Sequence, residues 1–262
     1  MIKFDLNGRT ALVTGAAGAI GKGIAAGFLR AGAKVYITDL DAAAVSGTIE
    51  ELSPAGVCFG MAADVTRPED AKAVVAAAAK AFDNRIDVLV NVAGIVAQGP
   101  VEDIDVEEWD RIFAVNCRGS FLFIKHVVPL MKARRFGRII NFSSKSGKTG
   151  SALMTHYSAA KAAIIGMTQA LAYELADFGI NVNCLCPGIT ENTGVWNNVS
   201  AGYVHNLKLP MDEVVRKFTA KVPLKRLARV EDIVAMTLFL ASEGGDYMTG
   251  QAINITGGRE MH

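Results

Sequence analysis

Short apolar runs rich in β-branched residues alternate along the chain with longer segments whose apolar positions recur at helical spacing. This alternation predicts strands that are each followed by a helix. The expected strands cover residues 10–13, 34–39, 57–62, 87–91, 138–142, 180–186 and 252–255. The expected helices include residues 20–31, 69–82, 106–133, 157–176 and 231–241. Strands that are apolar throughout are buried on both faces, so we expect a parallel sheet covered by helices on both faces.

The alternation runs over residues 1–262 without a repeat or a linker, which predicts a single α/β domain with a seven-stranded sheet. It breaks at residues 189–222, where polar residues and a short helical pattern near residues 211–220 take over. Long loops inside compact domains are usually binding loops or lids. This one follows the carboxyl end of a strand, where ligands bind in open α/β sheets. The sequence therefore predicts a substrate lid at about 189–222.

Composition and charge narrow the classes of partner. Apolar residues make up 51% of the chain, charged residues 20%, and the formal net charge is +1, so no global field favours nucleic acid or a membrane surface. No apolar run reaches the length of a membrane span, and no targeting segment is visible, so a cytoplasmic protein is expected. The four cysteines follow no disulfide framework and the four histidines are scattered. Free thiols and no metal site are therefore expected.

A glycine-rich turn follows the first predicted strand and opens the first predicted helix. It contains Gly15, Gly18, Ala19, Ile20 and Gly21. Glycines in this position allow the backbone to approach a pyrophosphate, which then lies at the helix N-terminus. A lone glycine-rich loop is weak evidence, but this one lies between a strand and a helix, as the motif requires.

Asp39 ends the second predicted strand. A carboxylate there accepts hydrogen bonds from ribose hydroxyls and repels a 2′-phosphate. No arginine lies in the glycine-rich turn or next to Asp39, which favours NAD over NADP. The competing interpretation of Asp39 is a helix N-cap or a turn residue.

Two further strand ends carry candidate cofactor residues. Asp64 and Val65 follow the third strand and could hold the adenine edge. Asn91, Ala93 and Gly94 follow the fourth, where small residues allow backbone contact with the ribose. Taken alone, either set could be ordinary strand-end capping.

Tyr157 and Lys161 are four residues apart at the start of an apolar helical run, so they lie along the same helix face. A phenol ionises near pH 10, but an adjacent cation favours the phenolate. Such a tyrosine can remove a proton from an alcohol while a cofactor takes the hydride. The alternative is a solvated surface pair.

The combined pattern resembles the short-chain dehydrogenase/reductase family over nearly the whole chain, from Thr14 to Gly258. The residues that carry the resemblance are the glycine-rich turn, Asp64, Asn91, Ala93, Gly94, Asn116, Ser144, Tyr157, Lys161, Pro187 and Gly188. The resemblance implies a single-domain, Rossmann-like, doubly wound sheet. Residues 143–150 and 249–258 look like those of bacterial sugar-alcohol and sugar-alcohol-phosphate dehydrogenases within that family.

The resemblance also implies residue roles. Tyr157 would be the general acid/base, and Lys161 would lower its pKa and bind the nicotinamide ribose. Ser144 would hydrogen-bond the substrate oxygen, and Asn116 would hold a water that links Lys161 to solvent. Ala19 and Asn192 depart from the family pattern. Asn192 stands where the family often has a threonine that contacts the nicotinamide amide, and Thr190 or Thr193 could make that contact instead.

The substrate is expected to be a small polar alcohol or ketone. Lys145 and Lys148 follow Ser144 closely and could pair with a substrate phosphate, and Trp196 lies in the predicted lid. Solvated loop lysines are the alternative. The leading hypothesis is NAD-dependent oxidation of a secondary alcohol on a polyol, phosphorylated or not. The alternatives are a 3-oxoacyl-thioester reductase and a catalytically silent NAD-binding sensor or scaffold.

Helices 106–133 and 157–176 are apolar over more than one stripe, which is more than packing on one sheet face needs. A homo-oligomer is therefore expected, and the family resemblance favours a tetramer.

Overall fold

The computed structural model describes residues 4–194, 196, 200, 204 and 210–262. Its strands are β1 (Thr10–Thr14), β2 (Lys34–Asp39), β3 (Cys58–Ala62), β4 (Val88–Asn91), β5 (Gly137–Phe142), β6 (Ile180–Pro187) and β7 (Ala252–Ile255). They form one parallel sheet in the order β3-β2-β1-β4-β5-β6-β7. The predicted fold class, a seven-stranded Rossmann-like sheet, is confirmed.

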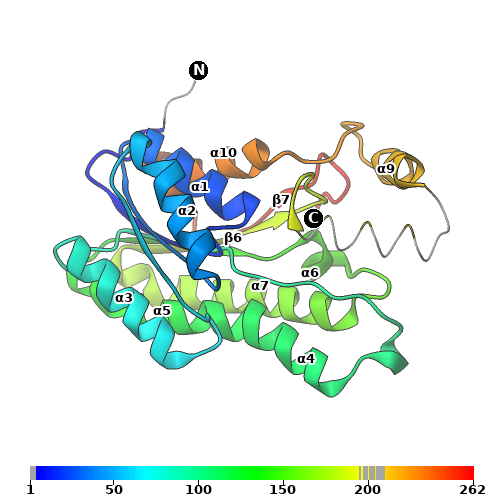
Figure 1. The fold of residues 1–262 in the computed structure, drawn as a ribbon, viewed down its shortest axis with the longest axis horizontal. Coiled ribbons are helices and arrows are strands. Elements are labelled where there is room, and N and C mark those ends of the chain that lie inside the picture. The colour runs from blue at the N-terminus through cyan, green and yellow to red at the C-terminus, as the bar shows by residue number, and fades with distance from the viewer. Residues whose placement is uncertain (1–3, 195, 197–199, 201–203, 205–209) are drawn as a thin grey trace.

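Helices cover both faces of this sheet (Figure 1). One layer holds α1 (Ala19–Arg30), α2 (Ala42–Leu52) and α10 (Val230–Ala241). The other holds α3 (Pro68–Ala81), α4 (Val106–Phe113), α5 (Gly119–Arg134) and α7 (Thr155–Leu175). The short helix α6 (Lys145–Thr149) and α9 (Met211–Thr219) lie beyond the carboxyl ends of the strands. Short 3₁₀ turns occupy Ser53–Ala55, Val101–Asp103, Ala176–Phe178 and Glu243–Gly245.

Successive residues of β1 show why the strands are apolar throughout. Val13 belongs to the buried cluster that contains Phe28 of α1, whereas Leu12 belongs to the cluster that contains Phe123 of α5. All four side chains are 0% exposed. Because neighbouring strand residues point to opposite faces, a sheet covered on both sides buries both sets of side chains, and most of these are apolar.

The sheet reverses its winding at β1. This strand pairs with β2 on one side and with β4 on the other, and α1 and α4 leave toward opposite faces. A crevice at such a switch point, outside the carboxyl ends of the strands, is where open α/β sheets bind ligands. The fold therefore brings the glycine-rich turn after β1 and the small residues after β4 to one edge.

The predicted helix at residues 106–133 is more complex than one regular helix. Between α4 and α5 the backbone forms a π-helical turn at Ala114–Arg118, with Asn116 in its middle. One extra residue per turn changes the direction of the side chains that follow, and such turns are frequent at functional sites. The helical pattern expected near residues 211–220 is confirmed by α9.

Candidate active site

The turn between β1 and α1 has the conformation that its glycines allow. Gly15 has a φ of 64°, and a Cβ there would lie 2.7 Å from Cα of Ala93. A Cβ on Gly21 would collide with the carbonyl oxygen of Gly15. Gly18 is the N-cap of α1 and would tolerate a Cβ, and Ala19 is the first residue of that helix. Gly15 and Gly21 therefore keep the turn close to the β4 loop and leave the α1 N-terminus open.

Asp39 lies at the same cleft. Its Oδ2 accepts a hydrogen bond from the Ala17 backbone N–H at 2.9 Å, and its Oδ1 accepts one from Leu40 N at 2.7 Å. Each carboxylate oxygen has a second lone pair that can accept from a ribose hydroxyl. Asp39 is therefore not an N-cap, since the Asp41 side chain caps α2 by accepting from Ala44 N.

The cleft has a volume of about 610 Å³ and contains most of the predicted nucleotide-binding residues. The predicted residues that line it are Gly15, Gly18, Ala19, Ile20, Gly21, Asp39, Asp64, Val65, Ala93 and Gly94. The Asp64 carboxylate is oriented by Thr66, whose backbone N–H and hydroxyl both donate to Oδ1, at 2.8 and 2.7 Å.

Asn91 is the exception. Its side chain is buried between strands, where Nδ2 donates to Asn141 Oδ1 at 2.9 Å, and it does not line the cleft. Asn141 in turn donates to the hydroxyl of Thr168. The Asn91 side chain therefore joins β4 to β5 behind the site, and the expected backbone contact of this segment with a ribose stays a prediction.

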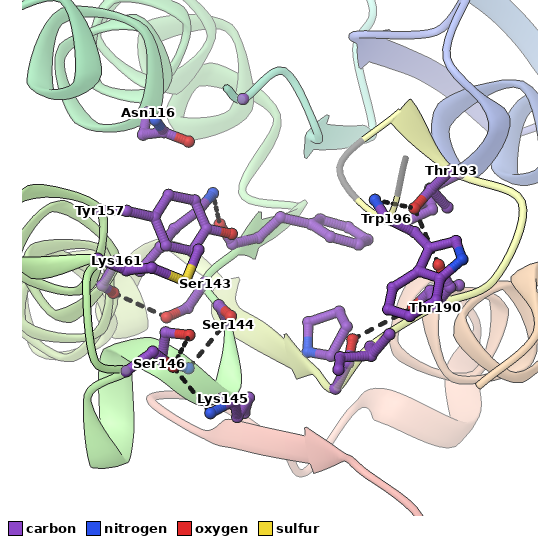
Figure 2. A pocket seen from close by; sticks show the side chains of 18 of the residues that line it. Asn116, Ser143, Ser144, Lys145, Ser146, Tyr157, Lys161, Thr190, Thr193 and Trp196 are labelled. Atoms are coloured by element: carbon purple, nitrogen blue, oxygen red, sulfur yellow. Dashed lines mark hydrogen bonds between the residues drawn. The ribbon is translucent and has the colours of Figure 1, made fainter. Parts of the chain in front are cut away.

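A second cavity of about 150 Å³ adjoins the cleft and shares Ile20, Val92, Gly94, Ile95 and Thr193 with it. The cavity is lined by all four predicted catalytic residues, Asn116, Ser144, Tyr157 and Lys161. Figure 2 shows Tyr157 and Ser144 on one side, facing Thr190, Thr193 and Trp196 on the other. The cleft that could hold a dinucleotide therefore opens directly onto the candidate catalytic group.

α6 and α7 are held tightly together, and this fixes the catalytic side chains. Ser144 is the N-cap of α6, and its Oγ accepts from Ser146 N at 3.1 Å. A Cβ on Gly147 would lie 2.7 Å from the carbonyl carbon of Lys161. Ser143 Oγ donates to the carbonyl oxygen of Lys161 at 2.7 Å.

The electrostatics of Tyr157 and Lys161 are dominated by burial. Burial raises the pKa of Tyr157 to about 12, against the opposing hydrogen bond from Ser144. Burial lowers the pKa of Lys161 to about 8. The Lys161 ammonium donates to the Phe142 carbonyl at 2.9 Å and lies 5.6 Å from the centre of the Tyr157 ring. Lys161 was expected to lower the pKa of Tyr157. Without a bound cofactor, burial of the phenol raises this pKa by more than the cation was expected to lower it.

Asn116 is held by two backbone carbonyls. Its Nδ2 donates to Ile95 O at 2.9 Å and to Ile112 O at 3.0 Å, and this leaves Oδ1 buried without a partner among the described residues. A Cβ on Gly94 would be 2.7 Å from that Oδ1 and 3.3 Å from Lys161 Nζ. An unpaired acceptor and an ammonium thus border the same glycine, an arrangement that suits a bridging water.

The segment after β6 forms the opposite wall. The predicted cofactor residues Pro187, Gly188 and Thr190 line the cavity together with Thr193 and Trp196. Thr193 Oγ1 donates to Thr190 O and accepts from Trp196 N. The Trp196 ring packs edge-on against Phe218 of α9, with the ring centres 6.4 Å apart. Residues 195, 197–199, 201–203 and 205–209 of the predicted lid lie outside the described residues.

The two predicted substrate lysines have different positions. Lys145 lines the cavity and donates to Ser151 Oγ at 2.8 Å, whereas Lys148 does not line it. The expectation that Lys148 faces the substrate is therefore corrected: Arg259, from the C-terminal segment, lines the cavity with Lys145 instead. Arg259 was not predictable from the sequence, because it lies far from Lys145 along the chain.

The arrangement fits a bound dinucleotide. The turn at Gly15 and Gly21 makes a cradle that side chains would fill, and Asp39 offers acceptors where an adenosine ribose would lie. The described residues contain no cluster of three or more His, Cys, Asp or Glu side chains able to hold a metal ion. None of the described helices has the length and apolar character needed to cross a bilayer.

Comparison with known proteins places this geometry in a family. Residues 15–260 match the family model described as enoyl-(acyl carrier protein) reductase. The chain belongs to the short-chain dehydrogenase/reductase family. It is thus an oxidoreductase that acts on CH–OH groups.

Members of the family with similar sequences include two sugar-alcohol dehydrogenases. The chain is 38% identical over 259 residues to sorbitol dehydrogenase from Cereibacter sphaeroides, covering 98% of this chain and 99% of the relative. It is 39% identical over 257 residues to galactitol 2-dehydrogenase from Agrobacterium fabrum, with coverage of 98% and 99%. Among solved structures, an actinorhodin polyketide ketoreductase variant with NADPH matches with a TM-score of 0.93 and 34% identity, covering 97% of this chain and 98% of that one.

Proposed function

We propose that this member of the family is an NAD-dependent dehydrogenase that interconverts a secondary alcohol and a ketone on a polyol or polyol phosphate, with Tyr157 as the acid/base. The observation that carries the proposal is the continuity of the nucleotide cleft with the cavity that holds Tyr157, Ser144 and Lys161. A nicotinamide ring bound there would supply the hydride acceptor and, when oxidised, a positive charge that favours a phenolate.

The protein's own groups would move and stabilise the proton. Tyr157 Oη takes the hydroxyl proton of the alcohol and returns it in the reverse reaction. Ser144 hydrogen-bonds the substrate oxygen, where alkoxide charge develops. Lys161 adds a cation behind the phenol, and a water held by Asn116 Oδ1 connects that cation to solvent. Positioned proton transfer of this kind contributes roughly 10²–10⁴-fold to rate.

The preference for NAD rests on Asp39. Its carboxylate is at the cleft, and Leu40, which follows it, is 70% exposed and carries no charge. The Asp39 carboxylate would repel a 2′-phosphate placed beside it, and the residues next to Asp39 in the sequence supply no cation to compensate. The NADPH of the matching ketoreductase structure belongs to that protein.

The substrate class rests on the relatives and on the cavity wall. Ser144, Ser146, Ser151, Thr190 and Thr193 line the cavity among residues that are otherwise mostly apolar. These hydroxyls offer partners to the hydroxyl groups of a polyol, which need them when they leave water.

The test is a spectrophotometric panel. Sorbitol, galactitol, their phosphates and a 3-oxoacyl thioester are each assayed with NAD(H) and NADP(H), and reduced nicotinamide is followed by absorbance. The proposal expects the highest kcat/KM with a polyol or polyol phosphate and NAD. Faster turnover of the thioester with NADPH would favour the reductase instead. Tight NADH binding with no turnover of any alcohol or ketone would favour a silent sensor.

A homo-oligomer, with a tetramer favoured, is part of the proposal. Phe121 of α5 is 47% exposed and Tyr173 of α7 is 90% exposed, although both helices pack on the sheet with another face. Large exposed apolar side chains on such helices are typical of subunit contacts. Light scattering of Phe121→Asp should then show a smaller species than the wild type; a monomeric wild type would contradict this part.

A further inference from the structure

One end of the substrate cavity is lined by cations and by no carboxylate. The titratable side chains that line the cavity are Lys145, Tyr157, Lys161 and Arg259. Lys161 lies buried next to Tyr157 and donates a hydrogen bond to the Phe142 carbonyl. Lys145 and Arg259 also line a small recess that continues from the cavity and holds Arg226. The far end of the cavity is therefore positively charged, and its lining contains no acidic side chain among the described residues.

The three cations at this end of the cavity differ in the hydrogen bonds and ion pairs that they already make. Arg226 is engaged by Asp232 in a bidentate pair, at 2.5 and 2.8 Å. Arg259 has only an Nε contact of 3.3 Å with Glu260 and a ring contact with Phe218 among the described residues. Its two terminal nitrogens, which form the fork suited to a phosphate or carboxylate, have no hydrogen bond there.

Lys145 has a neutral partner. Its ammonium donates to Ser151 Oγ, and Ser151 Oγ is 2.8 Å from Ser146 Oγ, so one of three donors is used and its partner is a hydroxyl. Burial lowers the pKa of Lys145, and the Arg259 charge lowers it further, while Glu260 opposes. Two like charges held close together in a partly buried cavity cost free energy that a bound anion would recover.

Glu260 offsets only part of this charge. It contacts Arg259 Nε, does not line either cavity, and is one carboxylate beside the three cations Lys145, Arg259 and Lys221. Lys148 does not line them either, although it is only three residues from Lys145. Figure 2 shows Lys145 on the same side as Ser144 and Ser146, beyond them from Tyr157.

We propose that Lys145 and Arg259 form a subsite for an anionic group, a phosphate or a carboxylate, carried by the substrate at the end remote from its reacting carbinol. This inference rests on the proposed function and deepens it: the preferred substrate is an anionic polyol derivative rather than a free polyol. Lys145 supplies a point charge and Arg259 a planar fork, the two complementary ways in which proteins hold such oxygens.

The kinetic test compares sorbitol, sorbitol 6-phosphate and gluconate as alcohols, with NAD. Lys145→Met and Arg259→Met should each lower kcat/KM for the preferred anionic substrate about ten- to a hundredfold, mainly through KM, and change that for sorbitol little. Lys148→Met is the matched control and should behave as the wild type. Lys145→Arg, which keeps the charge, should recover part of the loss. Equal effects of Lys145→Met on sorbitol and on both anionic substrates would overturn the subsite.

A binding measurement decides the matter without turnover. In protein saturated with NADH, so that the pyrophosphate position is filled, inorganic phosphate should raise the Tm more than chloride does at equal ionic strength. That excess should disappear in Lys145→Met and in Arg259→Met and persist in Lys148→Met. No excess in the wild type, or an unchanged excess in Lys145→Met, would refute the subsite. Failure of every alcohol in the kinetic assay would instead contradict the proposed function, and the phosphate measurement would still stand by itself.

Discussion

The Asp39 carboxylate accepts a hydrogen bond from the backbone N–H of Ala17 at 2.9 Å, so the end of β2 is joined to the glycine-rich turn by the residue proposed to select the cofactor. Asp39→Ser with Leu40→Arg removes the negative charge and places a cation beside it. We expect kcat/KM for NAD to fall and that for NADP to rise, each by about ten- to a hundredfold, because a charged hydrogen bond is lost for one and gained for the other. Initial rates with both cofactors measure the ratio; an unchanged ratio would contradict the role of Asp39.

Tyr157→Phe removes one hydroxyl from a side chain that is 7% exposed. We expect kcat to fall at least 10²–10⁴-fold, because the proton then lacks a positioned acceptor. NADH affinity, measured by fluorescence titration, should change little. Tyr247→Phe, at a fully exposed tyrosine, is the matched control and should keep wild-type rates. Substantial turnover by the Tyr157 variant would remove the acid/base assignment.

Lys161 gives a prediction about stability and pH. Its pKa is lowered from 10.5 to about 8 in the folded protein, so between these values the unfolded chain binds more protons than the folded one. The free energy of unfolding contributed by this residue therefore rises as the pH rises through that window, by up to about 3 kcal/mol.

Lys161→Met lacks this dependence. Denaturant unfolding of both proteins from pH 7 to 10 should show the wild type gaining stability relative to the variant as the pH rises. Parallel stability curves would mean that the ammonium is not desolvated in the folded state.

Gly94→Ala tests the space between Asn116 and Lys161. Its Cβ would be 2.7 Å from Asn116 Oδ1, closer than carbon and oxygen normally approach, so the amide and any water it holds must move. We expect kcat to fall about tenfold or more, because proton exchange through Lys161 is interrupted. Gly99→Ala is the matched control, since a Cβ there meets no atom within 4 Å. Equal kcat values for the two variants would argue against a proton path at Asn116.

The sequence predicted the sheet well because its signal is direct. Val13 and Leu12 are both apolar because β1 is covered on two sides, and apolar runs of this kind mark the central strands of the sheet. The positions of Ser144, Tyr157 and Lys161 were also predictable, since only the short helix α6, a loop and one helical turn connect them.

Features that depend on packing were not predictable in this way. The π-helical turn at Ala114–Arg118 lies inside a segment that the sequence predicts as one regular helix, so the prediction does not reveal it. The pKa of Tyr157 follows burial by distant segments rather than its sequence neighbour. Lys145 and Lys148 look equivalent in the sequence, and only the packing of α6 separates them.

Two backbone hydrogen bonds join the residues just after β6 to the residue that precedes α10 by two positions. They run from Ala228 N to Ile189 O and from Glu191 N to Ala228 O, and both are 2.9 Å long. Because these bonds fasten the two ends of the intervening segment to each other, replacements inside it need not disturb the strand that presents Pro187 and Gly188. Substitutions between these two anchor points should therefore alter the wall that Thr193 and Trp196 form without displacing β6.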